Sequence, residues 1–172
     1  MRSRSDVKKK ILTLEEVAEE SRRLRSTGSR VVATNGCFDI LHVGHVRYLA
    51  AARKLGDALV VGLNGDHSVC QLKGEGRPLN GEQDRAEVLA ALHSVDYITI
   101  FPEKRATNFL LAAHPAIYAK GGDYTSATLD PEERAVLDKF GSRIEIIPFE
   151  KGYSTSQLLT RIGKPEERAS AQ

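Results

Sequence analysis

The sequence predicts an α/β protein with a Rossmann-like, five-stranded parallel sheet that carries helices on both faces. Two observations predict this fold. First, short runs of β-branched and apolar residues alternate with longer helical segments along nearly the whole chain, which is the pattern of right-handed βαβ units. Second, residues 58–63 are apolar at almost every position, as expected of a strand that is buried on both faces.

Capping and turn residues set the boundaries of the predicted elements. Thr13 and Glu16 form a capping box at the start of the first helix, and Gly28 ends that helix. Pro131 lies in the first turn of a later helix, which Gly141 ends. In chain order we expect a helix between residues 13 and 28, a strand at 30–34, a helix at 43–55, a strand at 58–63, a helix at 82–92, a strand at 96–101, a helix at 106–113, a strand at 116–119, a helix at 131–140, a strand at 143–148 and a helix at 154–162.

The composition is that of a globular chain with one domain. The 172 residues are 41% hydrophobic and 28% charged, and two cysteines are too few for a disulfide framework. A net charge of +2 is too small for a typical nucleic-acid binder. No apolar stretch is long enough to span a membrane, and no apolar run follows the basic residues 1–10 as in a signal peptide. We therefore expect a cytoplasmic protein that binds neither nucleic acid nor membranes, with one domain at 11–163 and flexible tails at 1–10 and 164–172.

The residues after the first predicted strand indicate a phosphate-binding cradle. Gly36 lets the backbone approach a ligand, and the helix that begins near His42 offers free N–H groups and a favourable dipole to an anion. His42 and His45 are three residues apart, so both imidazoles lie on one face of the first helical turn. Gly44 between them adds no side chain that would obstruct a phosphate.

Two other interpretations of this pattern stay open. The histidines could bind a metal with Cys37 or Asp39 nearby, although a zinc site needs three or four ligands and no second ligand pair is apparent. They could also be purely structural residues at a helix start.

The longest segment without predicted structure, residues 64–80, follows the second strand. A connection of this length in a compact domain is usually functional or disordered. Lys73 lies there in a glycine-flanked loop that we expect to be mobile, and it could close over phosphates as a point charge, with Arg77 adding a planar guanidinium. A solvated turn is the alternative. Arg85, near the start of the next helix, could hold a phosphate or be an ordinary surface arginine.

Gly121, Gly122 and Asp123 follow the fourth predicted strand, at the same sheet edge as the histidines. The glycines leave room for a base or a ribose, and Asp123 can accept hydrogen bonds from either. A tight turn with a capping aspartate is the alternative.

Residues 42–45 resemble the His-x-Gly-His signature of the cytidylyltransferase-like nucleotidyltransferases, and residues 154–156 resemble the second, Ser-Thr-Ser/Thr signature of that superfamily. The likeness is narrower than the superfamily, because several segments are similar to the adenylyltransferase domain of the bacterial ADP-heptose synthases: 34–45, 72–78, 84–89, 95–97 and 120–124. It runs from about Ile11 to Ile162. That domain is fused to a sugar kinase in many bacteria, and this sequence resembles the stand-alone form. Ser156 stands where threonine is common, and residues 80–83 and 101–106 are less typical.

The resemblance implies transfer of AMP from ATP to a heptose 1-phosphate with release of pyrophosphate. Catalysis would then consist of positioning and charge stabilisation, because the attacking oxygen is already ionised. Magnesium is expected to accompany ATP, held mostly by phosphates and water, and the resemblance suggests a homodimer. The implied catalytic residues are His42, His45 and Lys73. The implied nucleotide-binding residues are Gly36, Cys37, Phe38, Asp39, His42, Gly44, His45, Gly121, Gly122, Asp123, Gly152, Ser154, Thr155 and Ser156, and those for the substrate phosphate are Lys73, Arg77 and Arg85.

Other functions are weaker interpretations. A cytidylyltransferase acting on glycerol 3-phosphate or a similar small phosphorylated alcohol shares both signatures, and only the detailed resemblance favours ATP. An NAD-dependent oxidoreductase would need Gly-x-Gly-x-x-Gly after the first strand, and a P-loop enzyme would need Gly-x-x-x-x-Gly-Lys-Ser/Thr; the sequence has neither. A non-catalytic nucleotide sensor is disfavoured by the presence of His42, His45 and Lys73.

Overall fold

A five-stranded, all-parallel sheet forms the centre of the protein, as predicted. We analysed a computed structural model that describes residues 7–122, 129–148 and Thr155. The strands are β1 (Val31–Gly36), β2 (Ala58–Asn64), β3 (Tyr97–Phe101), β4 (Ile117–Gly121) and β5 (Arg143–Ile147). Their order across the sheet is β3-β2-β1-β4-β5, and every neighbouring pair is parallel. The carboxyl ends of all five strands therefore lie at one edge.

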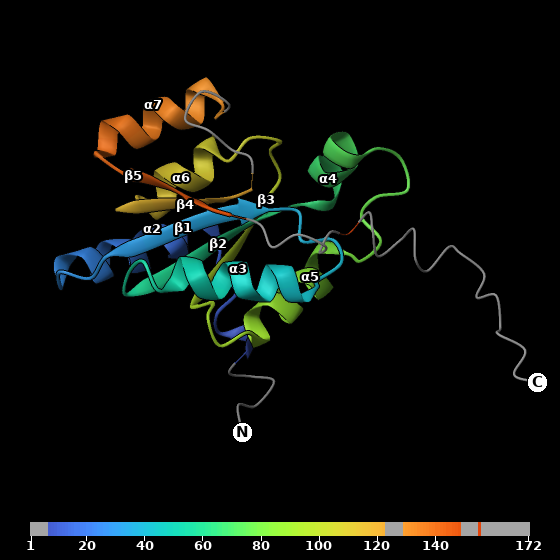
Figure 1. Ribbon diagram of the computed structural model, residues 1–172, viewed down its shortest axis with the longest axis horizontal. Coiled ribbons are helices and arrows are strands. Elements are labelled where there is room, and N and C mark those ends of the chain that lie inside the picture. The colour runs from blue at the N-terminus through green and yellow to red at the C-terminus, as the bar shows by residue number, and fades with distance from the viewer. Residues whose placement is uncertain (1–6, 123–128, 149–154, 156–172) are drawn as a thin grey trace, which may run out of the picture.

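Helices cover both faces of this sheet, so two hydrophobic clusters make up the core (Figure 1). One cluster packs α3 (Val43–Arg53) and α5 (Glu82–Ala91) against the sheet. The other packs α2 (Leu14–Ser26), α6 (Thr107–Ala113) and α7 (Pro131–Phe140) against the opposite face. Every residue of β2 is buried, which accounts for its apolar sequence.

The capping residues act as the sequence predicts. The backbone N–H of Glu16 donates to Oγ1 of Thr13 at 3.2 Å, and the Thr13 N–H donates to the Glu16 carboxylate at 2.7 Å. Helix α7 begins at Pro131 and ends at Phe140, and Gly141 follows in a left-handed conformation with φ of 66°. These short-range signals place the helix ends to within a residue or two.

Residues 64–80 contain a helix that was not predicted, α4 (Asp66–Lys73). Lys73 is therefore the last residue of a helix and does not lie within a loop. Only Ser68 and Val69 of this helix are buried, so it has no apolar stripe that sequence periodicity could reveal. An acidic first residue, a basic last residue and Gly74 after it were the available signals.

The N-terminal residues that the structure describes pack onto the domain, although residues 1–10 were expected to form a tail. Lys10 donates from Nζ to the backbone oxygens of Leu92 and Val95. The Val7 side chain packs against the α3 and α5 cluster. The domain therefore starts at least four residues before the expected boundary at Ile11. Thr155 is the one residue of the predicted helix at 154–162 that the structure describes. The rest of that helix and the predicted tail at 164–172 lie outside the described residues.

Candidate active site

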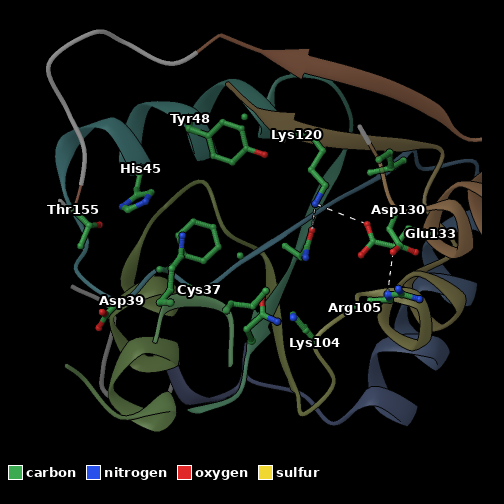
Figure 2. A pocket seen from close by; sticks show the side chains of 18 of the residues that line it. Cys37, Asp39, His45, Tyr48, Lys104, Arg105, Lys120, Asp130, Glu133 and Thr155 are labelled. Carbon is green, nitrogen blue, oxygen red and sulfur yellow. Dashed lines mark hydrogen bonds and ion pairs between the residues drawn. The ribbon is translucent and has the colours of Figure 1, made fainter. Parts of the chain in front are cut away.

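A cavity of about 940 Å³ opens at the carboxyl edge of the sheet, where ligands bind in folds of this kind (Figure 2). Its size suits a nucleotide with a second small substrate. Most of the predicted site residues in the described part of the chain line it: Gly36, Cys37, Phe38, Asp39, His45, Lys73, Arg77, Gly121 and Thr155. The predicted contacts Asp123, Gly152, Ser154 and Ser156 lie outside the described residues.

The two histidines stack at the start of α3. His42 is the N-terminal cap residue of this helix. The centroid of its ring lies 3.8 Å from the centroid of the His45 ring, and the two ring planes are 24° apart. The His45 ring also contacts Phe38 edge-on at 5.3 Å. Nδ1 of each histidine is buried and makes no hydrogen bond within the described chain. The His45 ring thus lines the cavity with an unused nitrogen, and the His42 ring stacks against it. The predicted site residues His42, Gly44 and Gly122 do not themselves line the cavity.

Burial keeps both imidazoles neutral. It lowers the pKa of His42 below its ordinary value. In His45, burial and then the neighbouring His42 lower the pKa to about 4. A neutral imidazole carries one N–H and one free nitrogen, so each ring can donate one hydrogen bond near pH 7 without carrying charge.

The loop between β1 and α3 has an unusual backbone conformation. Phe38 adopts a left-handed conformation with φ of 44°, which costs a non-glycine residue about 1 kcal/mol or more. A Cβ on Gly36 would lie 3.0 Å from the Phe38 ring, so any other residue there would push the ring aside by a few tenths of an ångström. This arrangement leaves the backbone at residues 36–39 open to the cavity.

Asp39 connects this loop by hydrogen bonds to the segment after α4. Its carboxylate accepts from Nη1 of Arg77 and from the backbone N–H of Leu79, both at 2.6 Å. The Asn80 side-chain amide donates in turn to the Asp39 backbone oxygen at 2.9 Å. The Asp39 side chain, expected to contact the nucleotide, is therefore bound to protein groups, and it holds Arg77 at the cavity wall.

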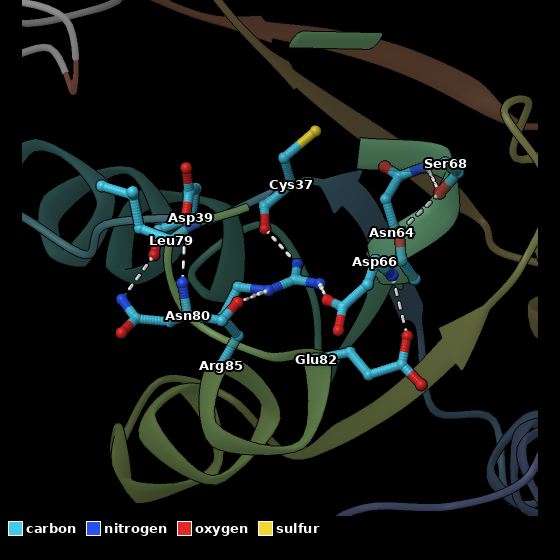
Figure 3. A network of polar contacts seen from close by, with 10 residues as sticks. Cys37, Asp39, Asn64, Asp66, Ser68, Leu79, Asn80, Glu82 and Arg85 are labelled. Carbon is cyan, nitrogen blue, oxygen red and sulfur yellow. Dashed lines mark hydrogen bonds and ion pairs between the residues drawn. The ribbon is translucent and has the colours of Figure 1, made fainter. Parts of the chain in front are cut away.

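Arg85 does not line the cavity. Its guanidinium binds instead to the loop after β1 and to the segments around α4 (Figure 3). Its side chain is 1% exposed. Nη1 donates to the Cys37 carbonyl, Nε to the Asn80 carbonyl at 2.9 Å, and Nη2 to the Asp66 carboxylate at 2.7 Å. This differs from the predicted phosphate contact, because three of the guanidinium's donors are used to hold the loop and the start of α4.

Sequence reasoning missed several polar residues on the other side of the cavity. Asn35, Lys104, Arg105, Lys120, Asp130 and Glu133 line it there. Burial lowers the pKa of Lys120, and the nearby Glu133 carboxylate partly offsets this. A lysine within an otherwise apolar strand was the one available signal, because lysine is rarely buried without a partner.

Cationic side chains outnumber anionic ones among the described residues that line the cavity. The cations are Lys73, Arg77, Lys104, Arg105 and Lys120, and the anions are Asp39, Asp130 and Glu133, which leaves an excess of two positive charges. Such a surface favours anionic ligands.

The described residues offer little support for a metal site at the histidines. No group of three His, Cys, Asp or Glu side chains gathers there or elsewhere in residues 7–122 and 129–148. Burial raises the pKa of the Cys37 thiol, which disfavours the thiolate that a metal would need.

Within residues 7–122 and 129–148, no helix is both long and apolar enough to cross a membrane.

Comparison with known proteins identifies relatives over most of the chain. Residues 33–162 match the model of the cytidylyltransferase-like family. The "Bifunctional protein HldE" of Pelobacter propionicus is 50% identical over 138 residues, and that of Geobacter sulfurreducens is 48% identical over 140 residues. These matches cover 80% and 81% of this chain but only 28% of each relative, so the chain spans little more than a quarter of their length.

Solved structures share the fold. The lipopolysaccharide core biosynthesis protein of Thermoplasma volcanium superposes with a TM-score of 0.59 and 31% identity, covering 74% of this chain and all of that one. A pantoate-beta-alanine ligase of Francisella tularensis superposes with a TM-score of 0.57, covering 82% of this chain and 67% of that one, and at 14% identity it supports the fold alone. The match to the family model takes in residues 33–36 of β1, the histidine pair and β4, and the chain therefore belongs to the cytidylyltransferase-like family.

Proposed function

We propose that the chain is a nucleotidyltransferase that transfers AMP from ATP to a heptose 1-phosphate. The observation that carries the proposal is the stacked pair of neutral histidines, which follows the loop at residues 36–39. The described residues that line the adjoining cavity include more cations than anions, which favours a polyphosphate. The sequence resemblance to ADP-heptose synthases supports ATP and a heptose 1-phosphate as substrates. The 50% identity to a protein named HldE and the 31% identity to a lipopolysaccharide core biosynthesis protein support the same choice.

In this reaction a phosphate oxygen of the sugar attacks the α-phosphorus of ATP. A bond forms between that oxygen and the phosphorus, the bond from the α-phosphorus to the bridging oxygen breaks, and pyrophosphate leaves. The neutral N–H groups of His42 and His45 donate to phosphate oxygens as negative charge develops, and Lys73 and Arg77 add positive charge from the cavity lining. No proton needs to be removed from the nucleophile.

Magnesium would enter with the nucleotide. Because the described residues provide no cluster of three suitable side chains, phosphate oxygens and water would hold most of its coordination sites. The ion would neutralise charge on the phosphates.

The test is pyrophosphate release from ATP or CTP with a panel of acceptors. We expect the fastest turnover with ATP and heptose 1-phosphate. Faster turnover with CTP and glycerol 3-phosphate would replace the proposal with a cytidylyltransferase. A protein that binds nucleotide but releases no pyrophosphate with any acceptor would be a sensor.

A further inference from the structure

A polar cluster lies on the side of the cavity away from His45 and Thr155 (Figure 2). Nζ of Lys120 donates to Oδ1 of Asn35 at 2.8 Å and lies 4.0 Å from Oε2 of Glu133. Lys120 and Glu133 are both nearly buried, with 10% and 8% of their side chains exposed. An ammonium and a carboxylate therefore lie close together at the wall of the cavity. Removing both charges from water costs free energy, and a role in ligand binding would account for their presence there.

Neighbouring groups hold this cluster in one arrangement. Oη of Tyr118 donates to Oδ1 of Asn35 at 2.6 Å and also contacts the Glu133 carboxylate at 3.3 Å. The other carboxylate oxygen of Glu133 accepts from the backbone N–H of Ala106 at 2.8 Å, which joins α7 to the start of α6. The cluster is therefore preorganised before any ligand binds.

The hydrogen bonds of Asn35 determine which way its amide faces. Because Oδ1 accepts from both Tyr118 and Lys120, Nδ2 is left to donate elsewhere, and it donates to none of the described residues. Asn35 itself lines the cavity. Its amide nitrogen is thus a hydrogen-bond donor available to a ligand.

The position of Asn35 relates the cluster to the reaction. Asn35 directly precedes Gly36, where the open loop of the phosphate cradle begins. A group bound at Nδ2 would therefore lie next to a phosphate in the cradle. The cluster combines amide and ammonium donors with carboxylate acceptors, which matches the paired donor and acceptor character of hydroxyl groups.

We propose that Asn35, Lys120 and Glu133 form the subsite for the hydroxyl-bearing part of the acceptor and help to select a sugar phosphate. Nδ2 of Asn35 donates to one hydroxyl oxygen, and the Glu133 carboxylate and Lys120 ammonium bind others. The inference rests on the proposed function, because it assigns the acceptor of that reaction to one side of the cavity.

The test variant is Asn35→Asp, which has nearly the same shape and can still accept from Tyr118 and Lys120. It replaces the free N–H donor with an oxygen. We expect KM for heptose 1-phosphate to rise at least tenfold, with a similar rise in its Kd measured calorimetrically in the presence of a non-hydrolysable ATP analogue. The new carboxylate also repels the phosphates of ATP, so the Kd for the ATP analogue should rise as well, but several-fold less than the acceptor constants. Lys120→Met should shift the acceptor constants in the same direction.

Gln83→Glu makes the same amide-to-carboxylate change at an exposed position of α5, outside the cavity lining, and serves as the control that should leave both ligands unaffected. A weakened ATP analogue with unchanged acceptor binding in Asn35→Asp would overturn the subsite and assign the cluster to the nucleotide. Unchanged constants for both ligands would overturn it as well. If the wild type neither binds nor turns over heptose 1-phosphate, the proposed function fails first, and the subsite for that acceptor fails with it.

Discussion

At the scale of single residues, burial sets the chemistry of the histidine pair. An exposed imidazole would be partly charged near pH 6.5, but His45 has its pKa lowered to about 4 by burial and by His42. A neutral N–H donor can stabilise the negative charge that develops in the transition state without binding the ground-state substrate equally tightly. The mechanism therefore depends on where the rings sit more than on their charge.

Replacing His45 with alanine should slow the reaction far more than it weakens ATP binding. If the ring donates to a phosphate oxygen mainly in the transition state, its loss should lower kcat by roughly 10²–10³, or about 3–4 kcal/mol. Steady-state kinetics and the Kd of ATP measure the two effects separately. A folded variant with near wild-type kcat would remove His45 from the mechanism.

The same burial predicts how stability depends on pH. The unfolded chain has the ordinary His pKa of 6.5 and the folded protein about 4 at His45, so the unfolded state binds more protons between these values. The stability of the wild type should therefore be fully present above about pH 6.5 and decrease as the pH falls toward 4. The free energy of unfolding, measured by urea denaturation across this range, should fall less steeply for His45→Asn. Parallel curves for the two proteins would contradict the assigned cause.

At the scale of elements, Arg85 connects three segments that carry the site. It binds the loop after β1 through Cys37, the start of α4 through Asp66 and the chain before α5 through Asn80. Glu82 adds a second link by accepting from the Asp66 N–H at 2.8 Å. These bonds place Lys73, at the far end of α4, relative to the histidine loop.

Arg85→Met should therefore damage both stability and catalysis. It leaves the Cys37 carbonyl without the Arg85 donor and removes the ion pair that holds the start of α4. Removal of one partner from a buried charged network costs about 3–5 kcal/mol. Because Asp66 is 45% exposed, we expect the lower end of this range. Thermal denaturation and kcat/KM measure the two effects. Arg143→Met, at a pair whose arginine is 63% exposed, is the control and should change both by little. A stable, fully active Arg85→Met protein would show that the loop does not need this connection.

At the scale of the whole molecule, the face of the sheet covered by α3 and α5 is the candidate surface for self-association. Val43 and Val46 on α3 and Val88 on α5 are 39%, 37% and 49% exposed, and both helices cover the same face of the sheet. Exposed apolar side chains are candidates for burial in an interface when they lie on one face. The homodimer expected from the sequence resemblance would bury such a surface.

Sedimentation at micromolar concentration should give a mass twice that of one chain. Val88→Lys should shift the equilibrium toward monomer, because burying an unpaired ammonium at an interface is costly. Leu111→Lys, a change at a 44% exposed position on α6 and so on the opposite face, should leave the dimer intact. Dissociation by the Leu111 variant alone would place the interface on the other face, and a monomeric wild type would contradict the prediction.

The sequence by itself determined the parts that depend on short-range physics. Alternating strand and helix patterns predicted five parallel strands, and the caps at Thr13, Pro131 and Gly141 placed helix ends. The spacing of His42 and His45 predicted two imidazoles on one helical face, and the structure stacks them. Periodicity, capping and turn preferences involve residues within a few positions of one another, so they can be read from a single chain.

Only the tertiary structure decided which distant side chains meet. Asn35 and Lys120 are 85 residues apart, and they touch because the strand order places β4 beside β1. Arg85 and Cys37 are 48 residues apart, and their bond turns an expected phosphate ligand into a support for the loop. Such contacts depend on strand order and on the direction of buried side chains, which local sequence preferences do not encode.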